Sequence, residues 1–402
     1  MDKDKANVPK IRFPGFTDPW EQCKLGDITE CYSGGTPSVR NKTYYGGTIP
    51  FIRSGEINAY STELFLTEEG LQNSSAKEVK KGDILYALYG ATSGEVGISH
   101  MNGAINQAIL AIKPSPKYNC YFIAQWLRKQ RNLIVNTYLQ GGQGNLSGNI
   151  VKDLVISIPE NEEEQSKIGT FFKDLDNLIT LHQRKLNHLQ DKKKSLLQKM
   201  FPKNGEDFPE LRFPGFTDPW EQRKFEDFTK LSQGLQIAIS KRYTENIDGS
   251  KYFYITNEFL NPKSDKKYYI KNPLKNVVAT KDDILMTRTG NTGKIVTNVS
   301  GAYHNNFFKI DFNHSKYDKM FLYYLLNIVC IQKEILSRAG TSTIPDLNHS
   351  EFYTIKVVLP SYEEQKKIGE FFKQFDDFII LHQRKLNHLQ EQKKALLQQM
   401  FV

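Results

Sequence analysis

Two short segments of the sequence combine residue types that suit contact with a polyanion. The first, 82–94, and the second, 283–294, each run from a strand-like apolar stretch into a turn rich in Gly, Thr, Ser and Asn. Glycine lets backbone N–H groups approach phosphate, and hydroxyl groups add further contacts. Arg288 has the donors to read a guanine edge, and Asn291 has the groups to read adenine. For each residue the alternative is an ordinary solvated turn.

Other residues of these types lie beside turns or in two stretches, 141–145 and 340–343, that precede the last apolar strand of each half of the chain. The candidates for contact with DNA are Arg53, Ser54, Tyr89, Thr92, Ser93, Gln143, Asn145, Lys241, Arg242, Thr256, Asn257, Arg288, Asn291, Thr292, Lys294, Asn305, Asn306, Ser342 and Thr343.

The patterns that carry catalysis or bind metals are missing from the sequence. The stretch 290–294 has the wrong spacing for a phosphate-binding loop that ends in Gly-Lys-Ser/Thr. No His-Glu-x-x-His, Cys-x-x-Cys or Gly-x-Ser-x-Gly motif occurs. Methyltransferase segments of the Asn-Pro-Pro-Tyr type are missing too, and Pro345-Asp346 lacks the acidic-x-Lys partner of a nuclease centre. We therefore expect no catalytic residue, no metal site and no cofactor in this chain.

The composition is that of a globular protein with a modest positive charge. The 402 residues include 54 Lys+Arg and 45 Asp+Glu, a formal charge of +9, which permits a polyanionic partner. Four cysteines, Cys23, Cys31, Cys120 and Cys330, have neither disulfide nor metal spacing, so we expect a cytoplasmic protein. No stretch approaches the roughly 20 apolar residues that a membrane span needs, so we expect no membrane association.

An internal repeat organises the chain. RFPGFTDPWEQ at 12–22 and LHQRKLNHLQ at 181–190 both recur 200 residues later. The segment 163–201 matches its copy at 28 of 39 positions, whereas the stretches between these copies diverge. The chain is therefore two halves of one plan, each large enough to hold a domain.

Each half begins with a varied body in which short apolar runs alternate with turn residues. The predicted strands include 84–89, 109–112, 154–158, 252–255 and 355–359, and the predicted helices are 121–138 and 319–337. The bodies are thus mixed α and β.

Each body is followed by a long helix with an apolar seam. Apolar residues recur at steps of four and three, the a/d pattern of a coiled coil. Roughly 40 residues would give a helix about 60 Å long. The seam residues are Ile168, Phe172, Leu175, Ile179, Leu186, Leu189, Leu196, Ile368, Phe372, Phe375, Ile379, Leu386, Leu389 and Leu396.

The two helices can bury their seams against each other, either parallel or antiparallel. We expect the antiparallel pair, which relates the two bodies by a pseudo-twofold axis. It places Lys193 over Phe375 and Lys393 over the equivalent position, with each methylene stem on the seam and each ammonium in water. His182 and His382 are interpreted as polar residues that set the register, rather than as metal ligands.

The predicted fold class is α+β, with two globular mixed α/β bodies separated by two long antiparallel coiled-coil helices. The predicted layout is body 1 at 1–160, helix 1 at 161–202, a linker at 203–211, body 2 at 212–361 and helix 2 at 362–402. Two unlike bodies at a fixed distance suit a polymer with two separated features. Duplex DNA is such a polymer, because domains on one face are spaced by turns of roughly 34–36 Å.

These features together resemble the specificity subunit of type I restriction-modification systems. The resemblance covers nearly the whole chain. It rests on the two-half plan, the Phe-Pro-Gly-Phe-Thr-Asp-Pro-Trp-Glu-Gln segments, the Asp-Ile-Leu strands and the Glu-Glu-Gln-x-Lys-Ile-Gly-x-Phe-Phe helix starts. The repeated helices make it specific.

The resemblance implies a DNA-binding subunit without catalysis of its own. Each body would be a target recognition domain for one part of a bipartite site in double-stranded DNA, and the helices would set the unread spacer. Two modification subunits, which methylate adenine with S-adenosylmethionine, would dock on the chain. Two restriction subunits, which use ATP and magnesium, can join them.

Two other classes of protein fit parts of the pattern. A two-headed protein-binding scaffold would use the same helices without reading DNA, and would show at most weak, sequence-independent DNA binding. A stand-alone nuclease or methyltransferase is disfavoured by the missing motifs.

Overall fold

The computed structural model describes residues 7–139, 145–203, 205–247, 249–261, 263–340 and 345–402, and it divides the chain into two compact units. Unit 1 comprises Met1–Gln183 and Arg384–Val402, and unit 2 comprises Arg184–Gln383. Each unit thus contains one body together with parts of both long helices, whereas the sequence-based layout kept bodies and helices apart.

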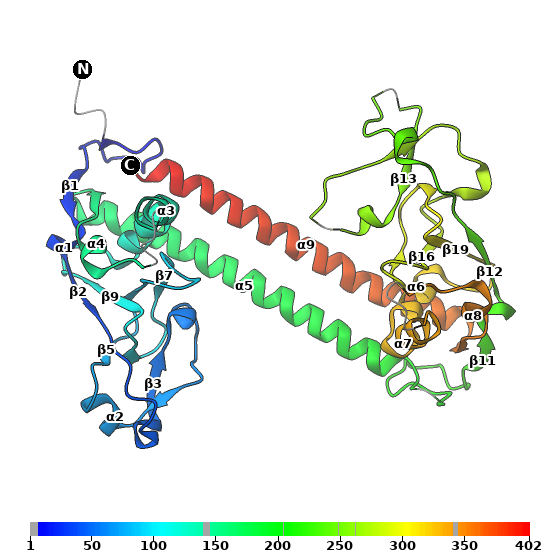
Figure 1. Ribbon diagram of the computed structural model, residues 1–402, viewed down its shortest axis with the longest axis horizontal. Helices are drawn as coiled ribbons and strands as arrows, with labels where there is room; N and C mark the ends of the chain where they lie inside the picture. The colour runs from blue at the N-terminus through cyan, green and yellow to red at the C-terminus, as the bar shows by residue number, and fades with distance from the viewer. Residues whose placement is uncertain (1–6, 140–144, 204, 248, 262, 341–344) are drawn as a thin grey trace. The chain divides into compact units, whose positions relative to one another are not determined.

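The described part of the body of unit 1 is built from short strands and from short or medium helices (Figure 1). Its elements are β1 Glu21–Lys24, α1 Leu25–Ile28, β2 Thr29–Ser33, β3 Tyr45–Ile52, β4 Phe65–Leu66, α2 Glu68–Gln72, β5 Lys77–Val79, β6 Ile84–Ala87, β7 Val96–Ile98, β8 Gly103–Ile105, β9 Ile109–Pro114, α3 Cys120–Tyr138, α4 Gly148–Lys152 and β10 Val155–Ile158. The strands form three sheets, in the orders β2-β9-β6-β7, β4-β3-β8-β5 and β1-β10. All pairs are antiparallel except β3 and β8.

The body of unit 2 repeats this topology. Its elements are β11 Glu221–Lys224, β12 Thr229–Gln233, β13 Tyr252–Ile255, β14 Tyr269–Ile270, β15 Val278–Ala279, β16 Ile284–Thr287, β17 Ile295–Val296, β18 Gly301–Tyr303, β19 Phe307–Phe312, α6 Lys319–Asn327, α7 Val329–Arg338, α8 His349–Tyr353 and β20 Lys356–Leu359. The sheet orders are β12-β19-β16-β17, β14-β13-β18-β15 and β11-β20, and β13 and β18 are the parallel pair. The predicted mixed α and β fold is confirmed.

The prediction of one helix over 319–337 is wrong, because the chain breaks at Ile328. Helices α6 and α7 meet there at 69°, and Ile328 has an extended backbone. The Asn327 amide donates to the carbonyl of Tyr323 (2.7 Å), and the Gln332 amide donates to that of Leu326 (2.6 Å). These side chains satisfy carbonyls near the break, an interaction that competes with helix continuation. The equivalent stretch of unit 1 is the single helix α3.

The two long helices are α5 (Glu162–Met200) and α9 (Tyr362–Met400), and Figure 1 shows them side by side. In unit 1, Phe172 near the start of α5 packs against Phe401 just after α9, with ring centroids 5.8 Å apart. In unit 2, Phe372 near the start of α9 packs against Phe201 just after α5, at 6.3 Å. The start of each helix therefore lies beside the end of the other, so the pair is antiparallel.

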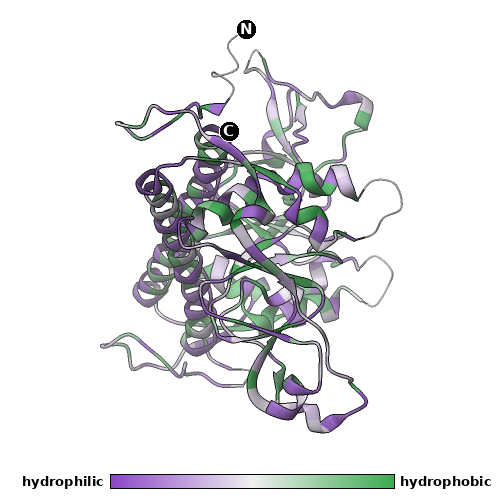
Figure 2. Cartoon of the chain, turned by 90° about the vertical axis from the view of Figure 1, so that its left-hand side faces the viewer, coloured by the Kyte–Doolittle hydropathy of each residue, from purple (hydrophilic) through white to green (hydrophobic). Residues whose placement is uncertain are grey.

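Most of the sequence of the two long helices is hydrophilic, as Figure 2 shows, and the apolar seam residues lie among their least exposed positions. Four predicted seam residues in unit 1, namely Ile168, Phe172, Leu386 and Leu389, are at most 6 % exposed. The other predicted seam residues are buried or half-buried: Leu175, Ile179, Leu186, Leu189, Leu196, Ile368, Phe372, Phe375, Ile379 and Leu396. His182 and His382 are half-buried in the same register.

The repeated helix start is explained by how it anchors each body. Glu164 is buried and accepts two bonds from Arg12, at 2.6 and 2.8 Å, and Gln165 accepts from the backbone N–H of Asn119 (2.9 Å). A Cβ atom on Gly169 would lie 2.3 Å from the Asn119 side-chain oxygen, so this close approach requires glycine. Unit 2 repeats the anchor through Arg212, whose two bonds to the equivalent carboxylate are both 2.8 Å long.

The seam lysines do not lie as predicted. We expected their ammonium groups in water, but Lys393 is 2.6 Å from Asp176 and only 17 % exposed. Asp176 also accepts from Arg128 (2.8 Å) and Gln125 (2.9 Å) of α3. The carboxylate thus joins α5, α9 and the body of unit 1, and burial lowers the pKa of Lys393.

Candidate nucleic-acid interface

Both predicted glycine loops are turns of β-hairpins. They connect β6 to β7 in unit 1 and β16 to β17 in unit 2. In unit 1 the N–H of Gly94 donates to the carbonyl of Ala87 (2.9 Å), and the equivalent bond in unit 2 is 2.8 Å long. Gly90 and Gly290 have φ angles of 84° and 83°, a left-handed conformation that favours glycine. The two turns therefore begin alike, but the turn of unit 1 (88–93) is one residue longer than that of unit 2 (288–292).

In unit 2, hydrogen bonds bring the predicted candidates Asn257, Arg288 and Asn306 together around this turn. The N–H of Arg288 donates to the carbonyl of Asn306 (2.7 Å), and its own carbonyl accepts from Leu347 (2.9 Å). The side-chain amide of Asn257 donates to the carbonyl of Thr289 (3.2 Å). The ends of β13 and β16 and the loop before β19 thus form one corner.

The Arg288 side chain lies over this corner and is 20 % exposed. Its Nη2 donates to Oδ2 of Asp346 at 2.6 Å, and the guanidinium carbon is 5.6 Å from the centre of the Phe308 ring. The His349 ring also packs against Phe308, with the ring centroids 4.5 Å apart. Burial lowers the pKa of His349, and the charge of Arg288 lowers it further.

In unit 1 the structure brings Tyr89 and Asn145 together as partners in a β-bridge. The Tyr89 hydroxyl donates to the carbonyl of Gln107, and the Gln107 side chain accepts from Thr36. Gln107 and Thr36 are exposed and were missed, because only the pairing of β2, β9 and β6 brings these distant segments together.

Arg53 follows β3 and precedes a short 3₁₀ helix, η3 (Ser54–Glu56). Its guanidinium donates to Glu56 (2.8 and 3.1 Å) and to Glu63 (2.9 Å). Arg53 lowers the pKa of Glu56 to about 2. The predicted DNA contact of Arg53 would therefore require a charge that is already shared with two carboxylates. Ser54 is half-buried.

Arg242 is bound within its own domain. Its Nε and Nη2 donate to the carbonyl of Ile237, at 2.9 and 2.7 Å. The guanidinium lies 5.2 Å from the ring of Tyr254 and 5.5 Å from that of Tyr268. These contacts make Arg242 a structural clamp, whereas its neighbour Lys241 is exposed.

Three candidate hydroxyl groups belong to side chains that are at most 8 % exposed. Ser93 donates to the carbonyl of Gly90 (2.9 Å), and Thr292 donates to that of Pro345 (2.8 Å). Thr256, at the end of β13, is equally buried. Ser93 and Thr292 therefore shape the loops.

The remaining candidates differ in exposure. Asn145, Lys241, Asn291 and Lys294 are exposed, and Thr92, Asn305 and Asn306 are half-buried. Gln143, Ser342 and Thr343 lie outside the described residues.

Both halves of the chain are similar to one known protein family. The sequence matches the family model of the type I restriction modification DNA specificity domain twice, over residues 17–191 and 217–391. The chain belongs to this family. It is a specificity subunit, which confers DNA sequence specificity on a type I restriction-modification system, and the resemblance noted in the sequence is confirmed.

Relatives and solved structures agree with this assignment. The putative type I restriction enzyme MjaX specificity subunit of Methanocaldococcus jannaschii is 25% identical, over 98% of this chain and 95% of that protein. The MjaVIII specificity subunit of the same organism is 23% identical, over 94% and 91%. The crystal structure of a type I S subunit from M. genitalium has a TM-score of 0.64 at 17% identity, covering 98% of this chain and 99% of that one.

Specificity subunits are non-catalytic, so the chain is not an enzyme, as the resemblance implied. Among the residues that the structure describes, no group of three or more His, Cys, Asp or Glu side chains could hold a metal ion. Across the same residues no single helix is long and apolar enough to cross a membrane. Only the bent pair α6 and α7 passes that test together, and most of α6 is buried in the core.

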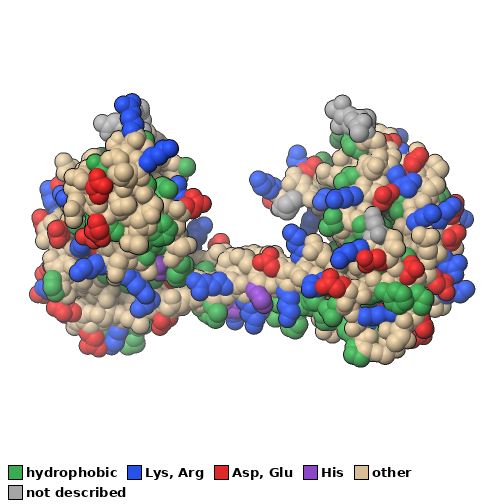
Figure 3. Space-filling view, turned by 90° about the horizontal axis from the view of Figure 1, so that it is seen from below, with side chains coloured by type: hydrophobic (Ala, Val, Ile, Leu, Met, Phe, Trp, Pro, Cys, Tyr) green, Lys and Arg blue, Asp and Glu red, His purple; other side chains and the backbone are tan. Residues whose placement is uncertain are grey.

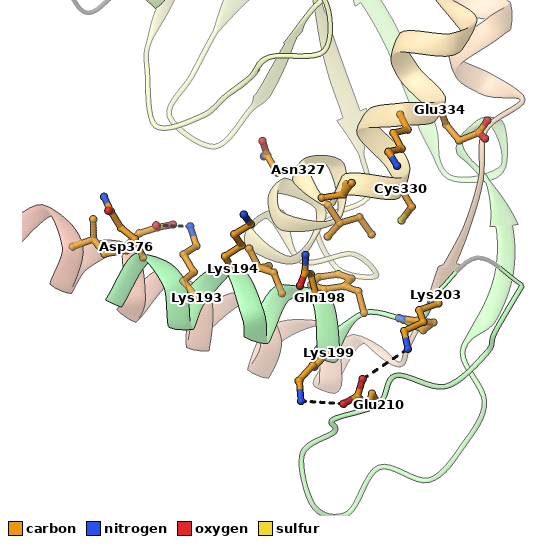
Figure 4. Close-up of a pocket in the computed structure, with 18 residues that line it drawn as sticks. Lys193, Lys194, Gln198, Lys199, Lys203, Glu210, Asn327, Cys330, Glu334 and Asp376 are labelled. Carbon is orange, nitrogen blue, oxygen red and sulfur yellow. Dashed lines mark hydrogen bonds and ion pairs between the residues drawn. The ribbon is translucent and has the colours of Figure 1, made fainter. Parts of the chain in front are cut away.

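Unit 2 of the specificity subunit also has a cleft of about 970 Å³ beside the break between α6 and α7 (Figure 4). Leu197, Phe201 and Val329 give it an apolar floor, and Lys194 and Lys333 line it too. Other lysines at its edge are ion-paired, as Lys193 is to Asp376 and Lys199 to Glu210. The cleft therefore combines apolar surface with positive charge.

Proposed function

We propose that each unit reads one block of a two-part sequence in double-stranded DNA. The observation that carries this proposal is that equivalent backbone hydrogen bonds place Leu88 in unit 1 and Arg288 in unit 2 at the start of the same hairpin turn. Leu88 is 3 % exposed, whereas Arg288 carries a charge at the surface. A shared framework with unlike side chains suits two readers of different sequences, because base-edge contacts carry the specificity and backbone contacts only position the protein.

The helix pair would set the length of the unread spacer between the two blocks. Each helix has 39 residues, which corresponds to about 58 Å at 1.5 Å per residue. The seam residues are buried at both ends of the helix pair, and Lys193 and Lys393 form ion pairs with Asp376 and Asp176. These contacts support a stiff helix pair. We interpret α5 and α9 as a ruler, which means that their length fixes the distance between the two DNA-reading units.

Two modification subunits would dock on the exposed faces of the helices, and restriction subunits would join the assembly. In unit 2, Phe378, Ile380 and Leu381 of α9 are 53, 48 and 59 % exposed, and in unit 1 Leu181 of α5 is 60 % exposed. Phe378 and Leu381 are three positions apart and so share one face of α9, and adjoining exposed apolar side chains favour a protein interface. A structure from a study of assembly of the type I restriction-modification system matches this chain with a TM-score of 0.51 at 16% identity, which supports the fold only.

The chemistry of the complex would reside in these partners. The modification subunits would use S-adenosylmethionine, and the restriction subunits ATP and magnesium. The specificity subunit would contribute DNA binding, and Figure 3 shows Lys and Arg side chains exposed along the long helices. Such charges attract the DNA backbone whatever its sequence.

The test uses the full chain with its modification subunit and compares two sets of substitutions. One set changes Arg53, Tyr89 and Asn145 of unit 1 to alanine, and the other changes Arg288 and Lys294 of unit 2. Mapping of methylated adenines first defines the site, and binding is then measured on duplexes with each base pair replaced. Each set of substitutions should remove the base preference of the complex in one block of the DNA site only.

Equal loss in both blocks would contradict the assignment of one reader to each unit. Weak binding that no base change alters, in the unsubstituted complex as well, would favour the two-headed protein scaffold instead.

A further inference from the structure

Arg288 is held differently from the arginines that anchor the two bodies. Arg212 presents both Nε and Nη2 to Glu364, at 2.8 Å each, which is the bidentate geometry of a structural pair. Arg288 reaches Asp346 through Nη2 alone, and its buried Nε has no hydrogen-bond partner. A guanidinium has five N–H donors, so much of the binding capacity of Arg288 is unused.

Two further polar atoms at the same corner also lack partners. The side-chain oxygens of Asn257 and Asn305 are buried and accept no hydrogen bond. Asn257 is bonded to the Arg288 turn through Thr289, and Asn305 precedes the residue whose carbonyl accepts from the Arg288 backbone. Buried polar atoms are normally paired. The corner thus offers a ligand one unpaired N–H donor, at Arg288, and two acceptor oxygens, at Asn257 and Asn305.

Asp346 occupies the place that such a ligand would take. Its carboxylate offers two acceptor oxygens, and the N7 and O6 atoms of guanine offer a similar pair of acceptors in the major groove. The carboxylate is 49 % exposed, so it is open to solvent while it holds Arg288.

The acid and the arginine occur together in unit 2 and are both replaced in unit 1. Thr289 and Asp346 form a β-bridge, and the corresponding bridge of unit 1 joins Tyr89 to Asn145. The uncharged Asn145 thus stands where Asp346 stands, and Leu88 stands where Arg288 does. Asp346 is therefore matched to the arginine, and the β-bridge that both units form does not require it.

We propose that Asp346 is a specificity-determining residue, which holds Arg288 until a guanine of the second DNA block replaces the carboxylate. The negative charge repels backbone phosphate, so Arg288 gains little on duplexes that lack the guanine. Specificity then comes from an element that disfavours wrong partners as well as from the correct contact. This inference rests on the proposed function. It adds that Arg288 reads a guanine and that Asp346 binds Arg288 when no guanine is present.

The test measures binding by the full chain with its modification subunit to three kinds of duplex. These are the mapped site, the site with single base pairs replaced in the second block, and an unrelated sequence, each over a range of salt concentrations. The variants are Asp346→Asn, Asp346→Glu and Arg288→Ala. The matched control is Asp282→Asn, which removes the same charge from an 84 % exposed residue at the opposite end of β16.

Arg288→Ala should lose about 5- to 150-fold of discrimination at one G·C pair, the range of one bidentate base contact. Asp346→Asn should bind the unrelated duplex more tightly, with a salt dependence steeper by about one phosphate contact, and should discriminate less at that same pair. Asp346→Glu should keep most of the discrimination, and Asp282→Asn should keep all of it.

The inference is overturned if Asp346→Asn discriminates as well as the unsubstituted complex, or if it binds every duplex equally more weakly with a lowered melting temperature. The second result would make Asp346 a structural residue. A failure of the proposed function looks different, because the unsubstituted complex would then show no base preference in the second block.

Discussion

The Nζ of Lys193 on α5 lies 2.5 Å from Oδ1 of Asp376 on α9, and the other oxygen of Asp376 accepts from the hydroxyl of Tyr324 on α6 at 2.6 Å. The Lys393–Asp176 pair repeats this relationship in unit 1. One carboxylate in each unit therefore ties both long helices to the body. These contacts explain how a charged residue is accommodated in an apolar seam.

Replacing this carboxylate should destabilise unit 2. Asp376→Asn leaves the ammonium of Lys193, which is 19 % exposed, without its counter-charge. Loss of a partly buried pair costs about 1–3 kcal/mol. Urea unfolding followed by circular dichroism should show a lower midpoint at an unchanged slope.

The neighbouring residue provides the control for this change. Asp377 pairs with Lys373 at the surface, where both side chains are more than half exposed. Asp377→Asn should shift the free energy of unfolding by no more than about 0.5 kcal/mol. Equal effects of the two substitutions would show that the contact between Asp376 and Lys193 does not stabilise the helix pair.

The Arg212–Glu364 pair that anchors the start of α9 should contribute more to the stability of unit 2 than the Lys193–Asp376 pair does. Glu364 is 1 % exposed and accepts two bonds from Arg212. Glu364→Gln leaves the arginine charge buried without compensation, at a cost of about 2–4 kcal/mol. The exposed neighbour Glu363→Gln is the matched control, and thermal unfolding of both variants measures the difference. A similar melting temperature for the two would contradict the role of this anchor.

Acid should weaken unit 1 through the contact between Arg53 and Glu56. Arg53 lowers the pKa of Glu56 from 4.5 to about 2 in the folded chain. A lowered folded pKa means that the stabilisation is complete above about pH 4.5 and is lost as the pH falls toward 2. The difference in unfolding midpoint between the unsubstituted chain and Glu56→Gln should therefore shrink over this range. A difference that stays constant from pH 6 to pH 2.5 would exclude this linkage.

Features with a regular local pattern could be predicted from the sequence. The steps of four and three over 168–200 placed the first long helix, and the structure has α5 at Glu162–Met200. The strand at 252–255, predicted from a short apolar run, matches β13. Periodicity and apolar runs are local properties, which the chain displays without tertiary contacts.

Features that depend on distant segments could not be predicted. Asp176 and Asp376 lie beside the seam, and their partners on α3 and α6 are 48 and 52 positions away in the sequence. Asp346 was considered only as part of a nuclease motif, because its contact with Arg288 joins residues 58 positions apart. The break at Ile328 was missed because side-chain bonds to carbonyls, and not Pro or Gly, end α6.

The most direct test of the central claim changes the length of the ruler. Inserting one heptad into both α5 and α9 keeps the apolar seam in register and lengthens the pair by about 10 Å. Mapping of methylated adenines in cells that carry this variant and its partners should show a longer spacer between two unaltered blocks. A spacer of unchanged length, or blocks whose own sequences change, would contradict the assignment of the helices as the ruler between two readers.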